Sequence, residues 1–201
     1  VEGTWIDESA LFDLRRSLQT IRDIVSFLKK EDEENTPYPH LQDLAGEVSI
    51  FPQLISKIDS ILDKYGRIKD NASTELSRIR REIAHVSSGI SKSLNAILRV
   101  AQKEGLVEKD VAPTMRDGRL VIPVAPAFKR KIKGIVHDES ASGKTVFIEP
   151  AEVVEANNHI RELESEERRE IIKILTAFTD ILRPLVPDIV QSYEFLGTID
   201  F

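Results

Sequence analysis

The chain has 201 residues, a formal net charge of −6 and a hydrophobic content of 41%, which is enough for one or two domains with a real core. It contains no cysteine, which excludes disulfides and thiolate metal sites and fits a reducing cytoplasm. No apolar run approaches the roughly 20 residues of a membrane-spanning helix and no signal peptide is visible, so we expect a cytoplasmic protein without a membrane partner. Because the chain begins at Val1 and its only methionine is Met115, we expect a processed chain or an excised piece of a longer protein.

The first sixty residues are predicted to form helices. Apolar residues recur at spacings of three and four through residues 7–30, which predicts an amphipathic helix with Asp7 as its N-cap. The polar, proline-containing run 29–39 is expected to end it. Similar spacings predict two shorter helices within residues 41–62, followed by a turn that contains Gly66. The apolar positions of the first helix are Leu11, Leu14, Leu18, Ile21, Val25 and Leu28.

Residues 74–104 carry the clearest helical pattern. Apolar residues follow a heptad rhythm that is broken only at Ser93. The pattern predicts a helix on the order of 45 Å long, at about 1.5 Å per residue. Such a helix either projects beyond a compact domain or packs against another helix of similar length. The heptad positions are Leu76, Ile79, Ile83, Val86, Ile90, Ile97 and Val100.

Residues 111–150 have a different character, with four prolines, three glycines and β-rich runs. Asp117-Gly118 is a strong signal for a two-residue hairpin, and the following LVIPV predicts a strand. The runs IKGIVHD and TVFIEP predict a second strand pair around the polar loop ESASG. We therefore predict a compact β insertion of about forty residues, a size that rarely folds alone.

The helical pattern returns over residues 152–182. Eight of the ten residues from 161 to 170 are charged, which predicts a solvated helix face held by ion pairs between residues four apart. Pro184 and Pro187 are expected to end this helix before a last one begins at Asp188. The apolar positions are Val153, Ile160, Leu163, Ile171, Ile174, Phe178 and Ile181.

Together these elements predict a protein that is mostly α with a small β insertion, in which long antiparallel lever helices carry a β-hairpin clamp-like tip. The expected segments are a helical core and lever at 1–110, a β clamp-like segment at 111–150, and a returning lever helix with a terminal helix at 151–201. The pair Asn157-Asn158 is unusual inside a helix, and we expect it to cap the helix or to hydrogen-bond the β segment.

Positive charge concentrates in the β segment, although the protein is acidic. Between residues 111 and 136, six Lys or Arg stand against a single Asp, which gives a window of +5. Lys and Arg clusters bind nucleic-acid phosphates without reading sequence, so we predict a nucleic-acid contact here. The alternative is that these are ordinary surface charges that balance the acidic helices. The predicted contact residues are Arg116, Arg119, Lys129, Arg130, Lys131 and Lys133, with Lys144 as an additional candidate.

Residues 138–145, DESASGKT, end like a phosphate-binding P-loop. However, Asp138 replaces the first glycine of that motif, and the following residues predict a strand rather than the helix that a P-loop opens. We interpret the segment as a β-hairpin loop, and His137 beside Asp138 as a strand-end pair rather than an acid–base dyad. The histidines have no metal-ligand spacing and no Ser/His/Asp arrangement is evident. We therefore expect no catalytic residue, metal site or cofactor in this chain.

Three stretches carry a resemblance to a known family: MRDGRLVIPV at 115–124, KGIVHDESASGKTVFIEP at 133–150 and VVEANNHIRELESEERREI at 153–171. They strongly resemble the second-branch MutS family (MutS-II), and residues 3–18 and 70–83 fit its preceding helices. The resemblance implies lever helices, an ABC-type ATPase domain that forms a homodimer, and in many members a C-terminal nuclease domain. It also implies binding of branched DNA, suppression of homologous recombination and, in some bacteria, rescue of collided ribosomes.

No Walker A, signature or nuclease motif is found in this chain. ATP and magnesium binding, and any endonuclease activity, are therefore implied only for other parts of a parent protein. The leading expectation is a non-catalytic DNA-binding lever and clamp module. The alternative is a structural or protein-interaction module, or one that binds ribosomal RNA. A nucleotide-binding enzyme, prompted by Gly143-Lys144-Thr145, is a third and disfavoured hypothesis.

Overall fold

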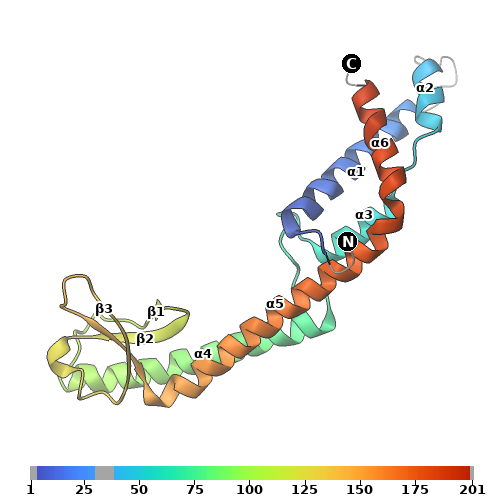
Figure 1. The fold of residues 1–201 in the computed structure, drawn as a ribbon. Helices are drawn as coiled ribbons and strands as arrows, with labels where there is room; N and C mark the ends of the chain where they lie inside the picture. The colour runs from blue at the N-terminus through green and yellow to red at the C-terminus, as the bar shows by residue number, and fades with distance from the viewer. Residues whose placement is uncertain (1–3, 30–38, 200–201) are drawn as a thin grey trace. The chain divides into compact units, whose positions relative to one another are not determined.

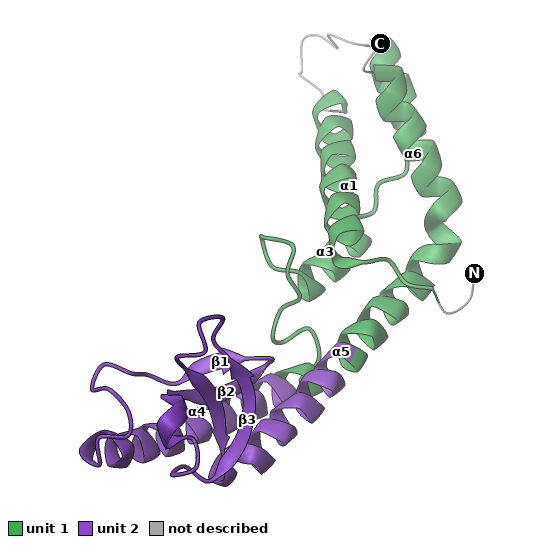
Figure 2. Cartoon of the chain, turned by 60° about the vertical axis from the view of Figure 1, so that its left-hand side comes forward, with its two compact units in different colours: residues 1–77, 169–201 green, residues 78–168 purple. Residues whose placement is uncertain are grey.

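The computed structural model describes residues 4–29 and 39–199 (Figure 1). The chain divides into two compact units (Figure 2): unit 1 comprises residues 1–77 and 169–201, and unit 2 comprises residues 78–168. The predicted fold class, mostly α with a small β insertion, is confirmed, whereas the predicted three-segment division of the chain stays a prediction. The helices are α1 Glu8–Leu28, α2 Pro39–Gly46, α3 Pro52–Ile61, α4 Thr74–Lys103, α5 Val154–Leu182 and α6 Val186–Ile199. The strands are β1 Thr114–Arg116, β2 Arg119–Val124, β3 Gly134–Glu139 and β4 Val146–Pro150.

Helix α1 begins and packs as its sequence predicts. Asp7 is the N-cap, because its carboxylate Oδ1 accepts a 2.8 Å hydrogen bond from the amide of Ala10 and so satisfies an N–H group that has no partner within the helix. The helix ends at Leu28, and most of the run that was predicted to end it falls on residues 30–38, which lie outside the described part. The buried residues are Leu11, Leu18, Ile21, Val25 and Leu28.

The core of unit 1 joins the N-terminal helices to the C-terminal ones. Leu11 of α1 and Ile58 of α3 are fully buried in one cluster with Phe178 of α5 and Ile189 of α6. Complete burial of a side chain of this kind contributes about 1.5–3 kcal/mol. Since these contacts are distant in sequence, they hold the N-terminal and the C-terminal helices together in one unit.

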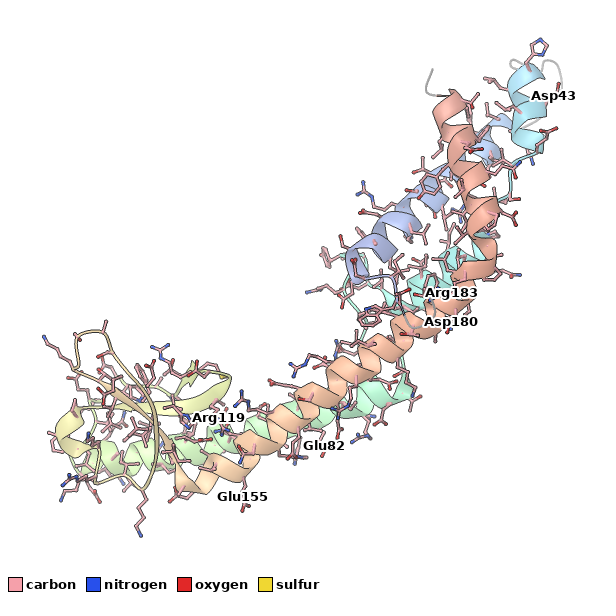
Figure 3. All side chains as sticks on the ribbon, viewed as in Figure 1. Asp43, Glu82, Arg119, Glu155, Asp180 and Arg183 are labelled. Carbon is pink, nitrogen blue, oxygen red and sulfur yellow. The ribbon has the colours of Figure 1, made fainter. Side chains whose placement is uncertain are left out.

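Helix α6 begins at Val186, two residues before the predicted start at Asp188. Pro187 therefore lies inside the first turn, where a backbone N–H has no helical partner and a proline is tolerated. A single 3-10 turn separates α6 from α5. Within it Arg183 forms a 3.2 Å ion pair with Asp180, and both side chains are labelled in Figure 3.

Within unit 2, α4 and α5 run side by side in antiparallel directions (Figure 1). Arg80 of α4 donates a 2.7 Å hydrogen bond to Glu167 of α5. In addition, Nη2 of Arg78 lies 3.5 Å from Oε2 of Glu166. The prediction that the glutamates of residues 161–170 form a solvated face held by pairs within their own helix is wrong for these two, because they face arginines on the neighbouring helix.

The buried line of α4 departs from the predicted heptad rhythm. Ile79, Ile90 and Ala101 are buried at intervals of eleven residues, whereas the heptad position Val100 is 57% exposed. A straight α-helix has 3.6 residues per turn and drifts about 20° per heptad from a strict seven-residue repeat. Over the 30 residues of α4 this drift moves the heptad stripe off the core. Ile181, the last predicted apolar position of α5, is likewise 47% exposed.

Unit 2 contains a four-stranded antiparallel sheet in the order β1-β2-β4-β3. The predicted Asp117-Gly118 hairpin is confirmed, with φ of +48° and +72° at the two residues, as a type I′ turn requires. The second predicted strand pair is also confirmed as β3 and β4. The central strands bury one face against α4 and α5 through Ile122, Val124, Val146 and Ile148.

Candidate nucleic-acid interface

Five consecutive residues between β2 and β3, Lys129-Arg130-Lys131-Ile132-Lys133, form what we call the basic loop. It follows a 3-10 turn at Pro126–Phe128, and the amide of Lys131 donates a 2.8 Å hydrogen bond to the carbonyl of Phe128. Phe128 and Ile132 are partly buried against the core of unit 2. These two apolar anchors hold the backbone, while the four cationic side chains of the loop are all exposed.

The four cations of the basic loop have no ion-pair or hydrogen-bond partner for their side chains within residues 4–29 and 39–199. They therefore place four positive charges on five residues without a neutralising carboxylate in contact. An exposed cation of this kind can bind a phosphate without first breaking an ion pair, and phosphate contacts of this type position a protein on nucleic acid. The basic loop is the part of the predicted cluster that is most open to a polyanion.

Lys144 is also exposed, in the loop that joins β3 to β4. Backbone bonds close this loop: the amide of Ser140 donates to the carbonyl of Thr145 at 2.8 Å, and the amide of Gly143 donates to the carbonyl of Ser140 at 2.7 Å. The amide of Thr145 donates to the Ser140 hydroxyl at 3.0 Å, and β4 begins at Val146. Since these amides are engaged and a strand follows, the interpretation as a hairpin loop rather than a P-loop is confirmed.

The two arginines of the first hairpin have partners within the protein. The guanidinium carbon of Arg116 lies 4.1 Å from the centroid of the Phe147 ring, a distance at which the cation is attracted to the ring face. Its Nε lies 3.5 Å from Oδ2 of Asp138. Arg116 therefore covers an aromatic side chain of the sheet, although its own side chain is 42% exposed.

Arg119 belongs to a buried network around Glu149 that sequence reasoning missed. The carboxylate of Glu149 is 0% exposed. Its Oε1 accepts 2.7 Å hydrogen bonds from Arg119 and from the Asn157 amide, and its Oε2 is hydrogen-bonded to Nε2 of His137. A buried carboxylate needs such partners because an unpaired charge is very costly away from water.

The network ties the sheet to the first turns of α5. Arg119, labelled in Figure 3, also donates a 2.7 Å hydrogen bond to Oδ1 of Asn158, and Asn157 donates to the carbonyl of Leu120 at 3.3 Å. The expectation that the asparagine pair hydrogen-bonds the β segment is confirmed. The interpretation of His137 as a strand-end partner of Asp138 is wrong, since the ring of His137 bonds Glu149 instead.

The electrostatics of Glu149 follow from these partners. Burial raises the pKa of the carboxyl group, but hydrogen bonds from His137, Asn157 and Arg119, together with the charge of Arg119, outweigh burial and hold the pKa of Glu149 below its ordinary value of 4.5. Glu149 is therefore ionised at neutral pH, and the Arg119 charge is neutralised inside unit 2 rather than offered to a ligand.

A second polar contact joins α4 to α5 in unit 2. Nε2 of His159 lies 3.0 Å from Oε1 of Glu82, which is labelled in Figure 3, and Nδ1 lies 3.6 Å from Glu162. Arg78 holds the other oxygen of Glu82 at 2.6 Å. The hydrogen bond to Glu82 raises the pKa of His159 above its ordinary 6.5, an effect that exceeds the lowering by burial.

We expect this contact to make the stability of the protein pH-dependent. Because the folded-state pKa of His159 is raised, its contribution is complete below 6.5 and is lost as the pH rises through the folded-state pKa. His159→Gln should lower the unfolding temperature near about pH 5.5 and change it little near about pH 8.5. Thermal unfolding of both proteins at both pH values measures this, and an equal loss at the two values would contradict it.

Metal ligation is the other chemistry that acidic helices suggest. In residues 4–29 and 39–199 no group of three or more His, Asp or Glu side chains is arranged to hold a metal ion. Nor does any helix of that part have the length and apolar character needed to cross a bilayer.

The chain is similar over essentially its whole length to bacterial proteins named Endonuclease MutS2. It is 34% identical over 199 residues to the protein from Alkaliphilus oremlandii and 37% identical over 200 residues to that from Finegoldia magna. It is 33% identical over 199 residues to that from Clostridioides difficile. These alignments cover 99–100% of this chain but 25% of each relative, so the chain spans about a quarter of the length of the curated relatives it matches.

No model of a known protein family matches the chain. The similarity to the relatives supports the MutS-II resemblance seen in the sequence and relates the chain to one segment of much longer proteins. The name of these relatives describes a nuclease, and it applies to those whole proteins.

Proposed function

We propose that this chain is a non-catalytic, nucleic-acid-binding segment of a MutS2-family protein, and that its basic loop contacts phosphates. One observation carries the proposal: four exposed cations on five consecutive residues have no carboxylate partner in the described part of the chain. Each phosphate that a Lys or Arg neutralises releases counterions from the nucleic acid, which makes binding strong at low salt and independent of sequence.

The other predicted cations take different roles in this proposal. Lys144 is exposed and adds to the positive surface of unit 2, and Arg116 is half-exposed and available at its outer edge. Arg119 is assigned to the Glu149 network, because its side chain is 14% exposed and both of its hydrogen-bonded partners belong to this chain. Within one hairpin, Arg119 is thus structural and Arg116 faces the ligand.

The segment is proposed to serve a larger protein. Its relatives are named endonucleases and are about four times as long, so ATP and magnesium binding, dimerisation and strand cleavage are assigned to parts outside these residues. The paired helices α4 and α5 are proposed to act as levers that carry the DNA-contacting segment. The biological role that fits is ATP-dependent recognition of branched DNA and restraint of homologous recombination.

Charge reversal in the basic loop tests the phosphate contact. The double variant Arg130→Glu, Lys131→Glu should bind duplex and junction DNA at least about tenfold more weakly, because two attractive contacts become repulsive. Fluorescence anisotropy with labelled DNA at fixed salt measures the affinity. The matched control is Arg16→Glu, Lys57→Glu, which reverses two exposed cations of unit 1 and should leave affinity within about twofold.

An unchanged affinity in the loop variant, or an equal loss in the control, would contradict the assignment of the basic loop. The same titration with a ribosomal RNA fragment addresses the alternative of a ribosome-binding module. Binding of the RNA fragment at least as tightly as junction DNA, with the same loss in the loop variant, would favour that alternative.

A further inference from the structure

A groove beside the basic loop is lined by apolar side chains as well as by lysines, and phosphate binding would engage the lysines alone. Its volume is about 340 Å³, within the range of small-ligand sites in proteins. Most of its lining is apolar, and two lysines of the basic loop also line it. The lining residues used below are Ile97, Val100, Leu106, Ile132, Lys131 and Lys133.

Val100 is the least expected of these residues. It is 57% exposed, because the buried line of α4 passes through Leu98 and Ala101 and leaves Val100 to one side. A single exposed apolar side chain needs no explanation. Here, however, Val100 shares one concavity with three further apolar residues and with two lysines that have no described partner.

We propose that this groove takes one unstacked nucleobase of a nucleic acid whose phosphates lie on the basic loop, an inference that rests on the proposed function. An unstacked nucleotide has a flat apolar face, an edge with N–H groups and a phosphate, and proteins bind such bases between apolar side chains. The apolar lining meets the base face, and Lys131 and Lys133 meet the phosphates. Glu104 and Glu152, which also line the groove, supply carboxylates that accept hydrogen bonds from the base edge.

The charges favour a nucleotide over a protein side chain. An apolar peptide side chain would fit the apolar lining, but it would offer no partner to the lysines or to the carboxylates of Glu104 and Glu152. A nucleotide satisfies the lining and the lysines together, and its neighbours along the strand continue onto the other cations of the basic loop. A base inside a continuous duplex has no free face to offer, so the groove confers a preference for unpaired segments.

The test uses the full 201-residue chain with three ligands: a mixed-sequence single strand, the duplex made from it, and the same strand with abasic sites throughout its centre. Val100→Ser should lower affinity for the single strand at least about fivefold and leave the duplex and abasic affinities unchanged, as expected for loss of the apolar surface that the base face covers. Val100→Tyr adds an aromatic face and should raise single-strand affinity. Val190→Ser, at a residue of α6 with 51% exposure, is the control and should change none of them.

The outcomes separate this inference from the proposed function. If wild-type protein binds all three ligands and Val100→Ser binds them equally well, the groove takes no base while the phosphate contact stands. A uniform loss across the three ligands would also overturn the inference, because a base contact cannot weaken abasic binding. If the wild-type protein binds none of the ligands, the proposed function itself fails.

Discussion

Replacing Glu149 with alanine should unfold unit 2 or bring it close to unfolding. The substitution leaves the guanidinium of Arg119 without its buried carboxylate, removes the partner of the His137 ring and removes one of the two partners of the Asn157 amide. Removing one member of a buried, hydrogen-bonded ion pair costs about 3–5 kcal/mol, which is a large fraction of the 5–15 kcal/mol typical of a whole domain. Denaturant unfolding followed by circular dichroism gives the change in free energy.

The control for this prediction is Asp138→Ala, which removes an exposed carboxylate that lies 3.5 Å from Arg116. Exposed pairs contribute about 0–1 kcal/mol, so this variant should unfold almost like the wild type.

The pH dependence of stability gives a second measure of the network. Because the folded-state pKa of Glu149 is lowered, its contribution to stability is present above pH 4.5 and is lost as the pH falls through the folded-state pKa. A Glu149→Ala protein within about 1 kcal/mol of wild type would contradict the structural role of the network.

Gly134→Ala should be the most damaging exchange of a glycine in the chain's described part. A Cβ at this position would lie 2.1 Å from the carbonyl oxygen of Glu149 and 2.9 Å from Cα of Pro150. Both atoms belong to the backbone of β4, so no side chain can move aside and β3 must separate from β4, its neighbour in the sheet. We expect a loss of about 3 kcal/mol or more, at the upper end of overpacking effects.

Gly89→Ala is the matched control, because a Cβ there meets nothing within 4 Å. Gly89 lies in the middle of α4, where alanine is favoured over glycine by up to about 1 kcal/mol. The same chemical change should thus stabilise the protein at one glycine and destabilise it at the other. Thermal unfolding of both variants decides this, and a Gly134→Ala protein as stable as the wild type would contradict the close approach of β3 and β4.

Local sequence signals predicted the elements whose physical cause is itself local. The hairpin depends on two consecutive residues, Asp117-Gly118, that accept positive φ, and the start of α1 depends on Asp7 and the amide three residues later. The asparagine pair could be predicted to bond the β segment because its helix propensity is poor. The hairpin and the helix start need no knowledge of what lies across the fold, whereas identifying Glu149 and Leu120 as the partners of Asn157 does.

The Glu149 network could not be predicted in this way. Its members come from β2, β3, β4 and α5, and the sequence run TVFIEP gives no sign that its glutamate points into a protein core. In the sequence, Glu149 follows the apolar residues Val146, Phe147 and Ile148 and precedes a proline. Its place beside these apolar residues was the one sign that its carboxylate is buried. Only the pairing of the strands brings Arg119 and His137 to the same carboxylate.

The heptad reading of α4 failed for a geometric reason. A seven-residue repeat describes helices that coil around one another, and α4 instead packs its second half against a sheet through Leu94 and Leu98. A straight helix then follows its own period of 3.6 residues per turn. The count of positive charges in residues 111–136 also treats Arg119 and Lys131 as equivalent. In the structure, Glu149 neutralises Arg119, whereas the Lys131 side chain has no partner in the described chain.

The salt dependence of DNA binding tests the central claim most directly. Wild-type protein and the variant Lys129→Gln, Arg130→Gln, Lys131→Gln, Lys133→Gln should be titrated with one duplex over a series of salt concentrations. Each lost phosphate contact should reduce the slope of log K against log salt by about 0.9. If all four cations of the basic loop contact phosphates, the slope becomes shallower by about 3.6 and affinity at low salt falls steeply. Two parallel lines, with equal slopes and equal affinities, would show that the basic loop does not touch the nucleic acid.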